Sequence, residues 1–153
     1  MSMTNELKEI IKEDLIRHEG YVAEIYLCSE NIPTFGIGHM VVEADPEYTW
    51  PVGTPVEKER IDTVFEADCD IAIKDCEALF PTWESMPDKA KRVLVNMAFN
   101  LGRNRLSQFK NMREAVGNSE WKKAAEEMTD SRWYYQVGRR SKELAEMMRS
   151  VRA

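Results

Sequence analysis

One short stretch decides the fold class: residues 21–42 favour β-strands, whereas most of the remaining chain has a helical pattern. Aromatic and β-branched residues are concentrated there, and Ser29-Glu30-Asn31 in the middle is typical of a turn. We therefore predict a β-hairpin or a three-stranded meander. Because so short a stretch forms only a small antiparallel sheet, the predicted fold class is α+β.

An amphipathic helix is predicted just before this stretch. Apolar residues recur at helical spacing over residues 4–18, with Thr4 or Asn5 as the N-terminal cap. Gly20 suits the position just past the C-terminus of the helix. Glu19 then lies in the last turn, where the helix dipole disfavours a second negative charge and favours the protonated acid.

Helices also account for the sequence after the strands. Residues 43–53 look like a loop, and Thr54-Pro55-Val56-Glu57 is typical of a helix start. Because Pro81 should end that helix, we predict it over 54–80, and at ~1.5 Å per residue it would be ~40 Å long. We predict a helix capped by Ser85-x-x-Asp88 and closed by Gly102, and others near 108–116, 119–129, 131–136 and 139–151.

These elements fit one domain of 153 residues, because no Pro/Gly/Ser-rich linker or repeat interrupts the chain. Within it we predict a small β lobe over about 18–53 and a connecting helix over about 54–80. Residues 1–17 together with 81–153 are predicted to form a larger, all-helical lobe.

Charge is distributed unevenly along the chain. Residues 1–80 hold 18 acidic and 6 basic residues, whereas residues 81–153 hold 9 and 15. Either these are two solvated faces of opposite sign, or the basic half binds an anionic polymer. The basic excess is modest and no nucleic-acid-binding motif accompanies it, so we do not expect a nucleic-acid partner.

The chain has no apolar run as long as a signal peptide or a membrane span. We therefore expect it to fold in a reducing cytoplasm without stable membrane association, and as a monomer. Three cysteines do not suggest a disulfide framework, and Cys69 and Cys76 should pack in the core. No ligand set for a metal is visible, and we expect no cofactor.

The residues most suggestive of chemistry lie in HEGYVAEIYLCSENIPTFGIGH, residues 18–39. A glutamate at a helix end is usually just solvated, but here Glu19 should meet the glycine turn Gly36-Ile37-Gly38. His39, which closes that turn, is best interpreted as a structural hydrogen-bond donor, with Asp68 as a candidate partner. Cys28 is either a half-buried small side chain or a nucleophile, and the second role lacks a recognisable signature.

The spacing of these residues resembles a known family. Glu19, eight residues, Cys28, five residues, Thr34 and then Gly-x-Gly-His is similar to the phage-type lysozymes of glycoside hydrolase family 24, the endolysins of tailed bacteriophages. Two further segments carry the same resemblance, namely Asn96-Met97-Ala98-Phe99-Asn100-Leu101-Gly102 and Ser131-Arg132-Trp133-Tyr134-x-Gln136.

The resemblance implies a two-lobed lysozyme fold and hydrolysis of the β-1,4 bond between N-acetylmuramic acid and N-acetylglucosamine in peptidoglycan. Glu19 would be the general acid, and Thr34 would help to position water. Cys28 stands where many members carry Asp. The family likeness also implies that Met40 and Phe99 line the cleft, that Asn100 contacts sugar or supports Glu19, and that Glu30 and Arg132 pair across the cleft mouth.

By the same resemblance, the enzyme would collect in the host cytoplasm and reach the cell wall through a separate pore, a holin. Two alternatives remain open. The chain could be a non-catalytic peptidoglycan-binding module that has kept the fold, or a helical scaffold whose sheet is merely structural. Retention of both Glu19 and Thr34 favours the enzyme.

Overall fold

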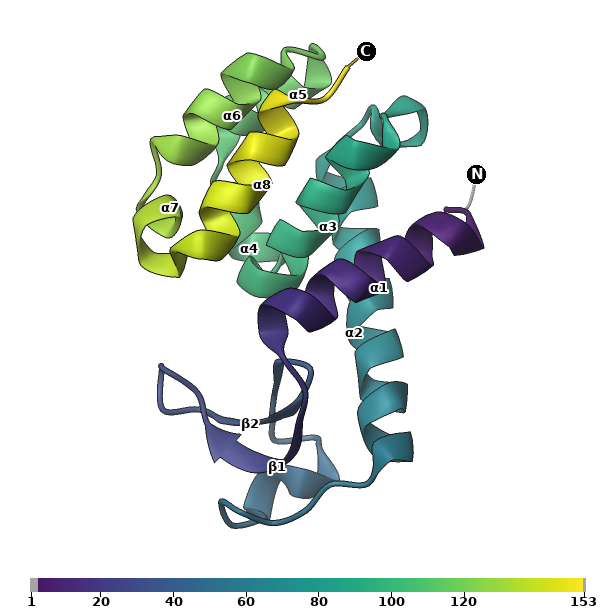
Figure 1. The fold of residues 1–153 in the computed structure, drawn as a ribbon, viewed down its shortest axis with the longest axis vertical. Helices are drawn as coiled ribbons and strands as arrows, with labels where there is room; N and C mark the ends of the chain where they lie inside the picture. The colour runs from purple at the N-terminus through teal and green to yellow at the C-terminus, as the bar shows by residue number, and fades with distance from the viewer. Residues whose placement is uncertain (1–2, 153) are drawn as a thin grey trace. The chain divides into compact units, whose positions relative to one another are not determined.

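The structure is a computed structural model that describes residues 3–152. The predicted α+β class is confirmed: a small antiparallel sheet accompanies many helices (Figure 1). The α-helices are α1 (Asn5–Glu19), α2 (Lys58–Leu79), α3 (Asp88–Leu101), α4 (Arg103–Ser107), α5 (Lys110–Gly117), α6 (Trp121–Thr129), α7 (Arg132–Val137) and α8 (Arg139–Arg149). The strands are β1 (Val22–Leu27), β2 (Pro33–Gly36) and β3 (His39–Met40), and the 3-10 turns are η1 (Pro46–Thr49) and η2 (Trp83–Ser85).

The chain divides into two compact units. The β unit is Lys12–Asp70, and the helical unit consists of the described residues up to Ile11 and from Ile71 onward. Helices α1 and α2 each contribute to both units. Within residues 3–152, none of the helices combines the length and the apolar character that crossing a membrane requires.

The sheet of the β unit has the order β1-β2-β3, and both strand pairs are antiparallel. The predicted meander is thus confirmed. The turn between β1 and β2 places Asn31 at φ +60°, a conformation that Asn tolerates better than most residues. Ile25 and Phe35 are fully buried beneath the sheet, which anchors its register by apolar packing.

Helix α1 agrees with its prediction at both ends. The Thr4 Oγ1 accepts a hydrogen bond from the Leu7 N–H at 3.2 Å, as an N-terminal cap should. Gly20 follows the helix with φ +79° and donates its N–H to the Ile16 carbonyl at 2.8 Å. Glu19 is therefore the last residue of α1.

The predicted start of the long helix is wrong. Helix α2 begins at Lys58, because residues 54–56 are extended and hydrogen-bond to β1 instead. The Thr54 carbonyl accepts the Ile25 N–H at 2.9 Å, and the Val56 N–H donates to the Ala23 carbonyl at 2.9 Å. These bonds, with the burial of Val56, outweigh the local capping pattern.

A second local prediction also fails, because Ser85 does not cap α3. Its hydroxyl donates to the Thr82 carbonyl within η2, and Pro87 occupies the cap position without a side-chain bond. The predicted end holds, since Gly102 closes α3 with φ +81°. The helices predicted near 108–116, 119–129, 131–136 and 139–151 correspond to α5, α6, α7 and α8, whereas α4 was not predicted.

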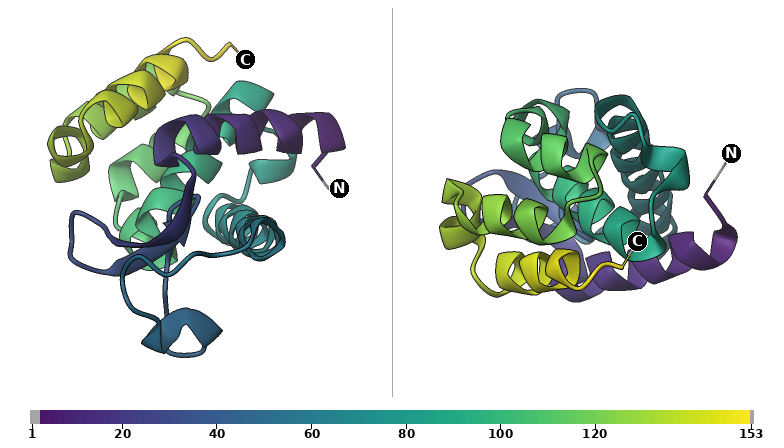
Figure 2. Two further views of the ribbon diagram at one scale, coloured as in Figure 1. Left: turned by 60° about the horizontal axis from the view of Figure 1, so that its bottom comes forward. Right: turned by 90° about the horizontal axis from the view of Figure 1, so that it is seen from above.

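In the helical unit, α8 lies alongside α6 and α3, and α5 packs against α6 (Figure 2). Their shared core is apolar and includes Leu94, Met112, Met128, Leu144 and Met148, all of them at most 1% exposed. Cys76 is also fully buried, and so is Cys69 in the β unit, which confirms their packing role.

One buried polar contact ties α8 to α3. Arg140, which is 8% exposed, donates Nε to the Asn96 Oδ1 at 2.8 Å and Nη2 to the Asn96 carbonyl at 3.3 Å. Asn96 itself is fully buried. A guanidinium removed from water needs such acceptors, because an unsatisfied buried charge is costly.

We predict that Asn96→Leu lowers the free energy of unfolding by about 2 kcal/mol, because it removes an acceptor from a buried cation. Urea denaturation followed by circular dichroism measures this. Glu146→Gln, which breaks an exposed ion pair with Arg149, is the matched control and should change little. Equal effects of the two variants would contradict the role of the buried contact.

Candidate active site

One face of the sheet gathers the candidate catalytic residues. Tyr26 is the Cα partner of Thr34 in the β1–β2 pair, and Thr34 is the partner of Met40 in the β2–β3 pair. Because directly paired residues point to the same face, Tyr26, Thr34 and Met40 form a row across the sheet. Cys28 follows the end of β1 two residues after Tyr26 and lies beside Thr34.

The turn after β1 surrounds the Cys28 thiol with hydrogen-bond donors. Burial raises the pKa of Cys28, but hydrogen bonds from the backbone N–H groups of Ile32 and Glu30, and one with the Thr34 side chain, outweigh it. The pKa of this thiol is therefore lower than its ordinary value. Backbone amides thus stabilise the Cys28 thiolate, a role that a neighbouring cation could otherwise have filled.

Thr34 is almost completely buried, with 2% of its surface exposed. Its hydroxyl donates to the Ile32 carbonyl at 2.8 Å, which fixes the orientation of the oxygen. The single hydroxyl proton goes either to this carbonyl or to the Cys28 thiolate, not to both at once. In both cases the oxygen keeps a lone pair, so Thr34 is suited to accept a hydrogen bond from water.

Glu19 meets the glycine turn, as predicted. Gly36 and Gly38 adopt φ +67° and φ +68°. A Cβ on Gly38 would lie 2.5 Å from the Glu19 Oε1 and 2.7 Å from its Cδ, so with any other residue here the carboxyl group would have to leave this position. The end of α1 and the turn between β2 and β3 thereby place an acid against bare backbone.

Tyr26 is a member of this site that the sequence argument missed. Burial raises its pKa, and the negative charges of Glu19 and Cys28 raise it further, so the phenol lies close enough to both groups to sense them. The signal was available in the alternation of strand residues, because Tyr26 and Cys28 are two positions apart on one face.

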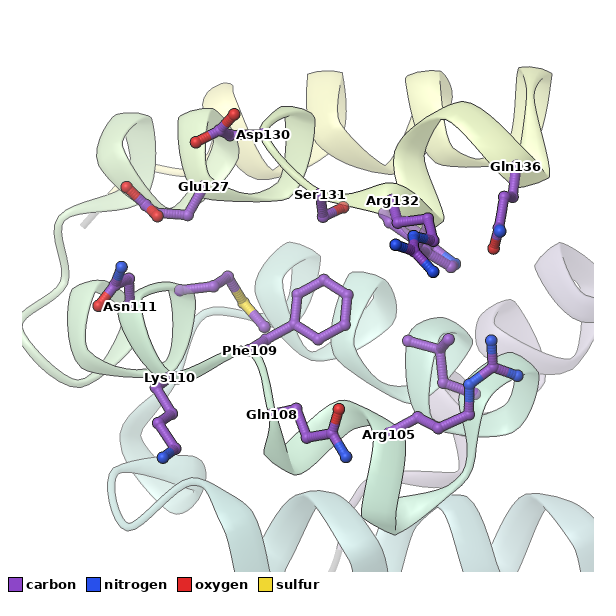
Figure 3. A pocket seen from close by; sticks show the side chains of 13 residues that line it. Arg105, Gln108, Phe109, Lys110, Asn111, Glu127, Asp130, Ser131, Arg132 and Gln136 are labelled. Atoms are coloured by element: carbon purple, nitrogen blue, oxygen red, sulfur yellow. The ribbon is translucent and has the colours of Figure 1, made fainter.

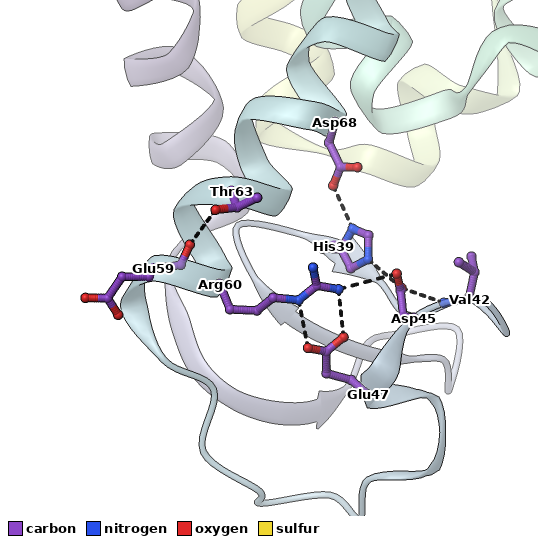
Figure 4. Close-up of polar contacts among 8 residues, drawn as sticks. All are labelled: His39, Val42, Asp45, Glu47, Glu59, Arg60, Thr63 and Asp68. Carbon is purple, nitrogen blue, oxygen red and sulfur yellow. Dashed lines mark hydrogen bonds and ion pairs between the residues drawn. The ribbon is translucent and has the colours of Figure 1, made fainter.

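His39 is structural, and the expected partner Asp68 is confirmed (Figure 4). The imidazole Nδ1 is 2.7 Å from Asp68 Oδ2, and Nε2 is 2.8 Å from Asp45 Oδ2. Burial lowers the pKa of His39, but the hydrogen bonds with the two carboxylates outweigh it, so the pKa is raised overall.

Arg60 extends this cluster, again in a way that the sequence argument missed. Its Nε and Nη2 donate to the Glu47 Oε2 and Oε1 at 2.8 and 2.9 Å, a bidentate pair in which Glu47 is only 2% exposed. Nη2 also lies 3.6 Å from Asp45 Oδ1. These hydrogen bonds from Arg60 lower the pKa of Glu47.

The other predicted residues are divided between the two units. Met40 is 42% exposed, and Glu30 is exposed in the turn after β1. Phe99, Asn100 and Arg132 belong to the helical unit, where Asn100 Oδ1 accepts the Trp133 Nε1–H at 2.8 Å. The pairing of Glu30 with Arg132 stays a prediction, as do the contacts of Met40, Phe99 and Asn100 with substrate.

Arg132 lines a pocket of about 310 Å³ in the helical unit (Figure 3). The lining is mixed in charge, with Arg105, Lys110 and Arg132 as cations and Glu127 and Asp130 as anions. Phe109 and Trp133, whose rings meet edge to face at 6.1 Å, provide its apolar wall. The pocket therefore suits a ligand that carries both charges and some apolar surface.

A helix-terminal acid placed against a glycine turn, within a small sheet joined to a helical unit, characterises the lysozyme class of glycoside hydrolases. The chain belongs to the phage lysozyme family, whose family model matches residues 16–150. It is accordingly a lysozyme, a hydrolase of the muramidase type.

Individual relatives differ in length. The chain is 28% identical to probable T4-type lysozymes 2 and 1 of Dictyostelium discoideum, covering 91% of itself and 91% of each. It is 31% identical over 150 residues to the pre-baseplate central spike protein Gp5 of Enterobacteria phage T4. That match covers 85% of this chain but 26% of the spike protein, so the chain spans about a quarter of that relative.

We predict that Gly38→Ala abolishes most of the lytic activity. The new methyl group would occupy the space of the Glu19 carboxyl group, and the positive φ would strain any residue with a Cβ. Gly53→Ala is the matched control, because Gly53 has φ +93° and open space around it. Turbidity clearing by the folded variants tests this, and full activity of Gly38→Ala would contradict the proposed packing.

Proposed function

We propose that this lysozyme hydrolyses the β-1,4 bond between N-acetylmuramic acid and N-acetylglucosamine in peptidoglycan, with Glu19 as the general acid. The observation that carries the proposal is the placement of the Glu19 carboxyl group against Gly38, in the same unit as Cys28 and Thr34. Packing against a residue without a side chain fixes one side of the Glu19 carboxyl group.

The chemistry requires two proton transfers. Glu19 gives its proton to the leaving glycosidic oxygen as the bond to the anomeric carbon breaks. A water molecule held by the Thr34 oxygen attacks that carbon, and the Cys28 thiolate takes the proton that this water loses. Backbone N–H groups around Cys28 support the thiolate, which lets it act where a carboxylate would otherwise serve.

The mixed charge of the helical-unit pocket supports a role in binding the stem peptide of peptidoglycan. Stem peptides carry carboxylates and an amino group close together. Arg105, Lys110 and Arg132 would bind the carboxylates, whereas Glu127 and Asp130 would bind the amine. Phe99, Asn100 and Met40 would contact the sugars, and Glu30 would pair with Arg132 when substrate is enclosed.

We further propose that the enzyme acts as an endolysin that causes host cell lysis. The proposal of this role comes from the resemblance of the Glu19, Cys28 and Thr34 spacing to the endolysins of tailed bacteriophages, and the family match supports the muramidase activity that the role requires. In this proposal the protein collects in the host cytoplasm, acts as a monomer and reaches the periplasm and cell wall through a holin pore.

Glu19→Gln should reduce hydrolysis by about 10²–10⁴-fold, because an amide cannot donate the proton that a carboxylic acid gives. Mass spectrometry of muropeptides from purified peptidoglycan measures the products, which for the wild type should have reducing-end muramic acid. Glu24→Gln, an exposed glutamate of β1, is the control. If Glu19→Gln stays active, the assignment of Glu19 as the general acid is wrong. If the wild type binds peptidoglycan without cleaving it, the chain is a binding module and not an enzyme.

Alkylation of Cys28 should also inactivate the enzyme. Iodoacetamide should label Cys28 selectively, because Cys69 and Cys76 are fully buried and burial raises the pKa of Cys76. Loss of lysis should follow labelling of Cys28 in parallel, whereas Cys28→Asp should retain activity and resist the reagent. Complete labelling without any slowing of lysis would reject a role for this thiol.

A further inference from the structure

We propose that five charged residues of the β unit form a positioning device for the catalytic acid. This His39 cluster consists of His39, Asp45, Glu47, Arg60 and Asp68. It holds the glycine turn in the position in which Gly38 contacts the Glu19 carboxyl group. The inference rests on the proposed role of Glu19 as general acid, and it assigns to these residues a task beyond stabilising the fold.

The turn is bounded by two residues that are paired across it. Phe35 and His39 are Cα partners in the β2–β3 pair, and their rings lie 5.1 Å apart. Gly36, Ile37 and Gly38 span the gap between them. Gly38 is bonded directly to His39. Any displacement of the His39 backbone therefore also displaces Gly38, which the Glu19 carboxyl group contacts.

His39 is fixed from two directions. Asp68 comes from α2 and faces Nδ1, whereas Asp45 comes from the loop after β3 and faces Nε2. Carboxylates only accept hydrogen bonds, so both contacts require an N–H on each nitrogen and therefore the imidazolium form. A neutral ring would keep one of the two bonds and turn a lone pair toward the other carboxylate.

Each carboxylate is in turn held by other elements. Asp45 Oδ2 accepts the Val42 N–H at 3.0 Å, and its other oxygen lies 3.6 Å from Arg60 Nη2. Arg60 is anchored by the buried Glu47 of η1. The cluster thus joins β3, the following loop, η1 and α2, and all its members lie within the β unit (Figure 4).

The charge balance makes the cluster sensitive to the proton on His39. Asp45, Glu47 and Asp68 are three anions, and Arg60 with protonated His39 supplies two cations. Loss of the imidazole proton leaves one cation among three carboxylates, which then repel one another. The carboxyl group of Glu19 lies across the turn, where it meets Gly38.

The direction of the pH effect follows from the shifted groups. Because the pKa of His39 is raised on folding, its contribution to stability is complete below about 6.5 and is lost as pH rises through the folded pKa. Burial raises the pKa of Asp45, but its partners outweigh this and lower it, so its contribution is lost as pH falls below about 3.8. The turn should be held best between these limits.

The test compares Asp45→Asn and His39→Gln with Asp62→Asn, an exposed residue of α2 that pairs only with Lys58 among the ion pairs described for it. Steady-state kinetics on soluble, uncrosslinked peptidoglycan are measured from pH 4 to 10, well below each variant's unfolding temperature. Asp45→Asn should lower kcat about 10-fold and change KM less than about 2-fold. The reason is that a misplaced Glu19 weakens the stabilisation of the transition state more than the binding of peptidoglycan. Its alkaline limb of kcat should move to lower pH by about one unit.

A direct readout is the carbon-13 NMR chemical shift of the Glu19 carboxyl group, which reports the surroundings of that group. It should change in Asp45→Asn and stay unchanged in Asp62→Asn. If Asp45→Asn and His39→Gln lower the unfolding temperature but leave kcat, its pH profile and this chemical shift as in Asp62→Asn, the cluster is only structural. Activity retained by Glu19→Gln would instead overturn the proposed function, so the two failures are distinguishable.

Discussion

The contact between the Gly38 backbone and the Glu19 carboxyl group is the constraint on which the site depends. A Cβ at this glycine would overlap the acid, and its φ of +68° disfavours any other residue. Gly20 ends α1 directly after Glu19 and so sets the position of the acid in the chain, whereas Gly38 leaves space for its carboxyl group. The sheet, its turn and the charged cluster behind the turn are arranged around this contact.

Hydrogen bonds from the backbone take the place of a charged partner at Cys28. Near neutral pH a thiol is mostly protonated and cannot accept a proton, whereas a carboxylate is ionised, so a thiol serves as a base only when its anion is stabilised. The turn after β1 points the N–H groups of Glu30 and Ile32 at the thiol, and Thr34 adds a side-chain hydrogen bond. The same turn therefore defines both the strand pairing and the electrostatics of the site.

Local sequence patterns predicted the helices and strands correctly where the residues at an element's own ends set its boundaries. The strands of residues 21–42, the cap of α1 and the glycines that end α1 and α3 all follow from residue type. The pattern at 54–57 failed because Thr54 and Val56 pair with β1, a strand some thirty residues earlier. A capping pattern shows only that a helix could begin at these residues. Hydrogen bonds to a distant strand decide whether it does.

The α+β class, the spacing of Glu19, Cys28 and Thr34 and the glycine turn follow from residue order alone, because each leaves a local signature, whereas Asp68 could be named only as a candidate partner of His39. The proximity of Tyr26 to the acid and the thiol, and the joining of Asp45, Arg60 and Glu47 to His39, became evident from the folded chain. Charged residues in loops have no periodicity, so their partners are fixed by how the chain packs in three dimensions.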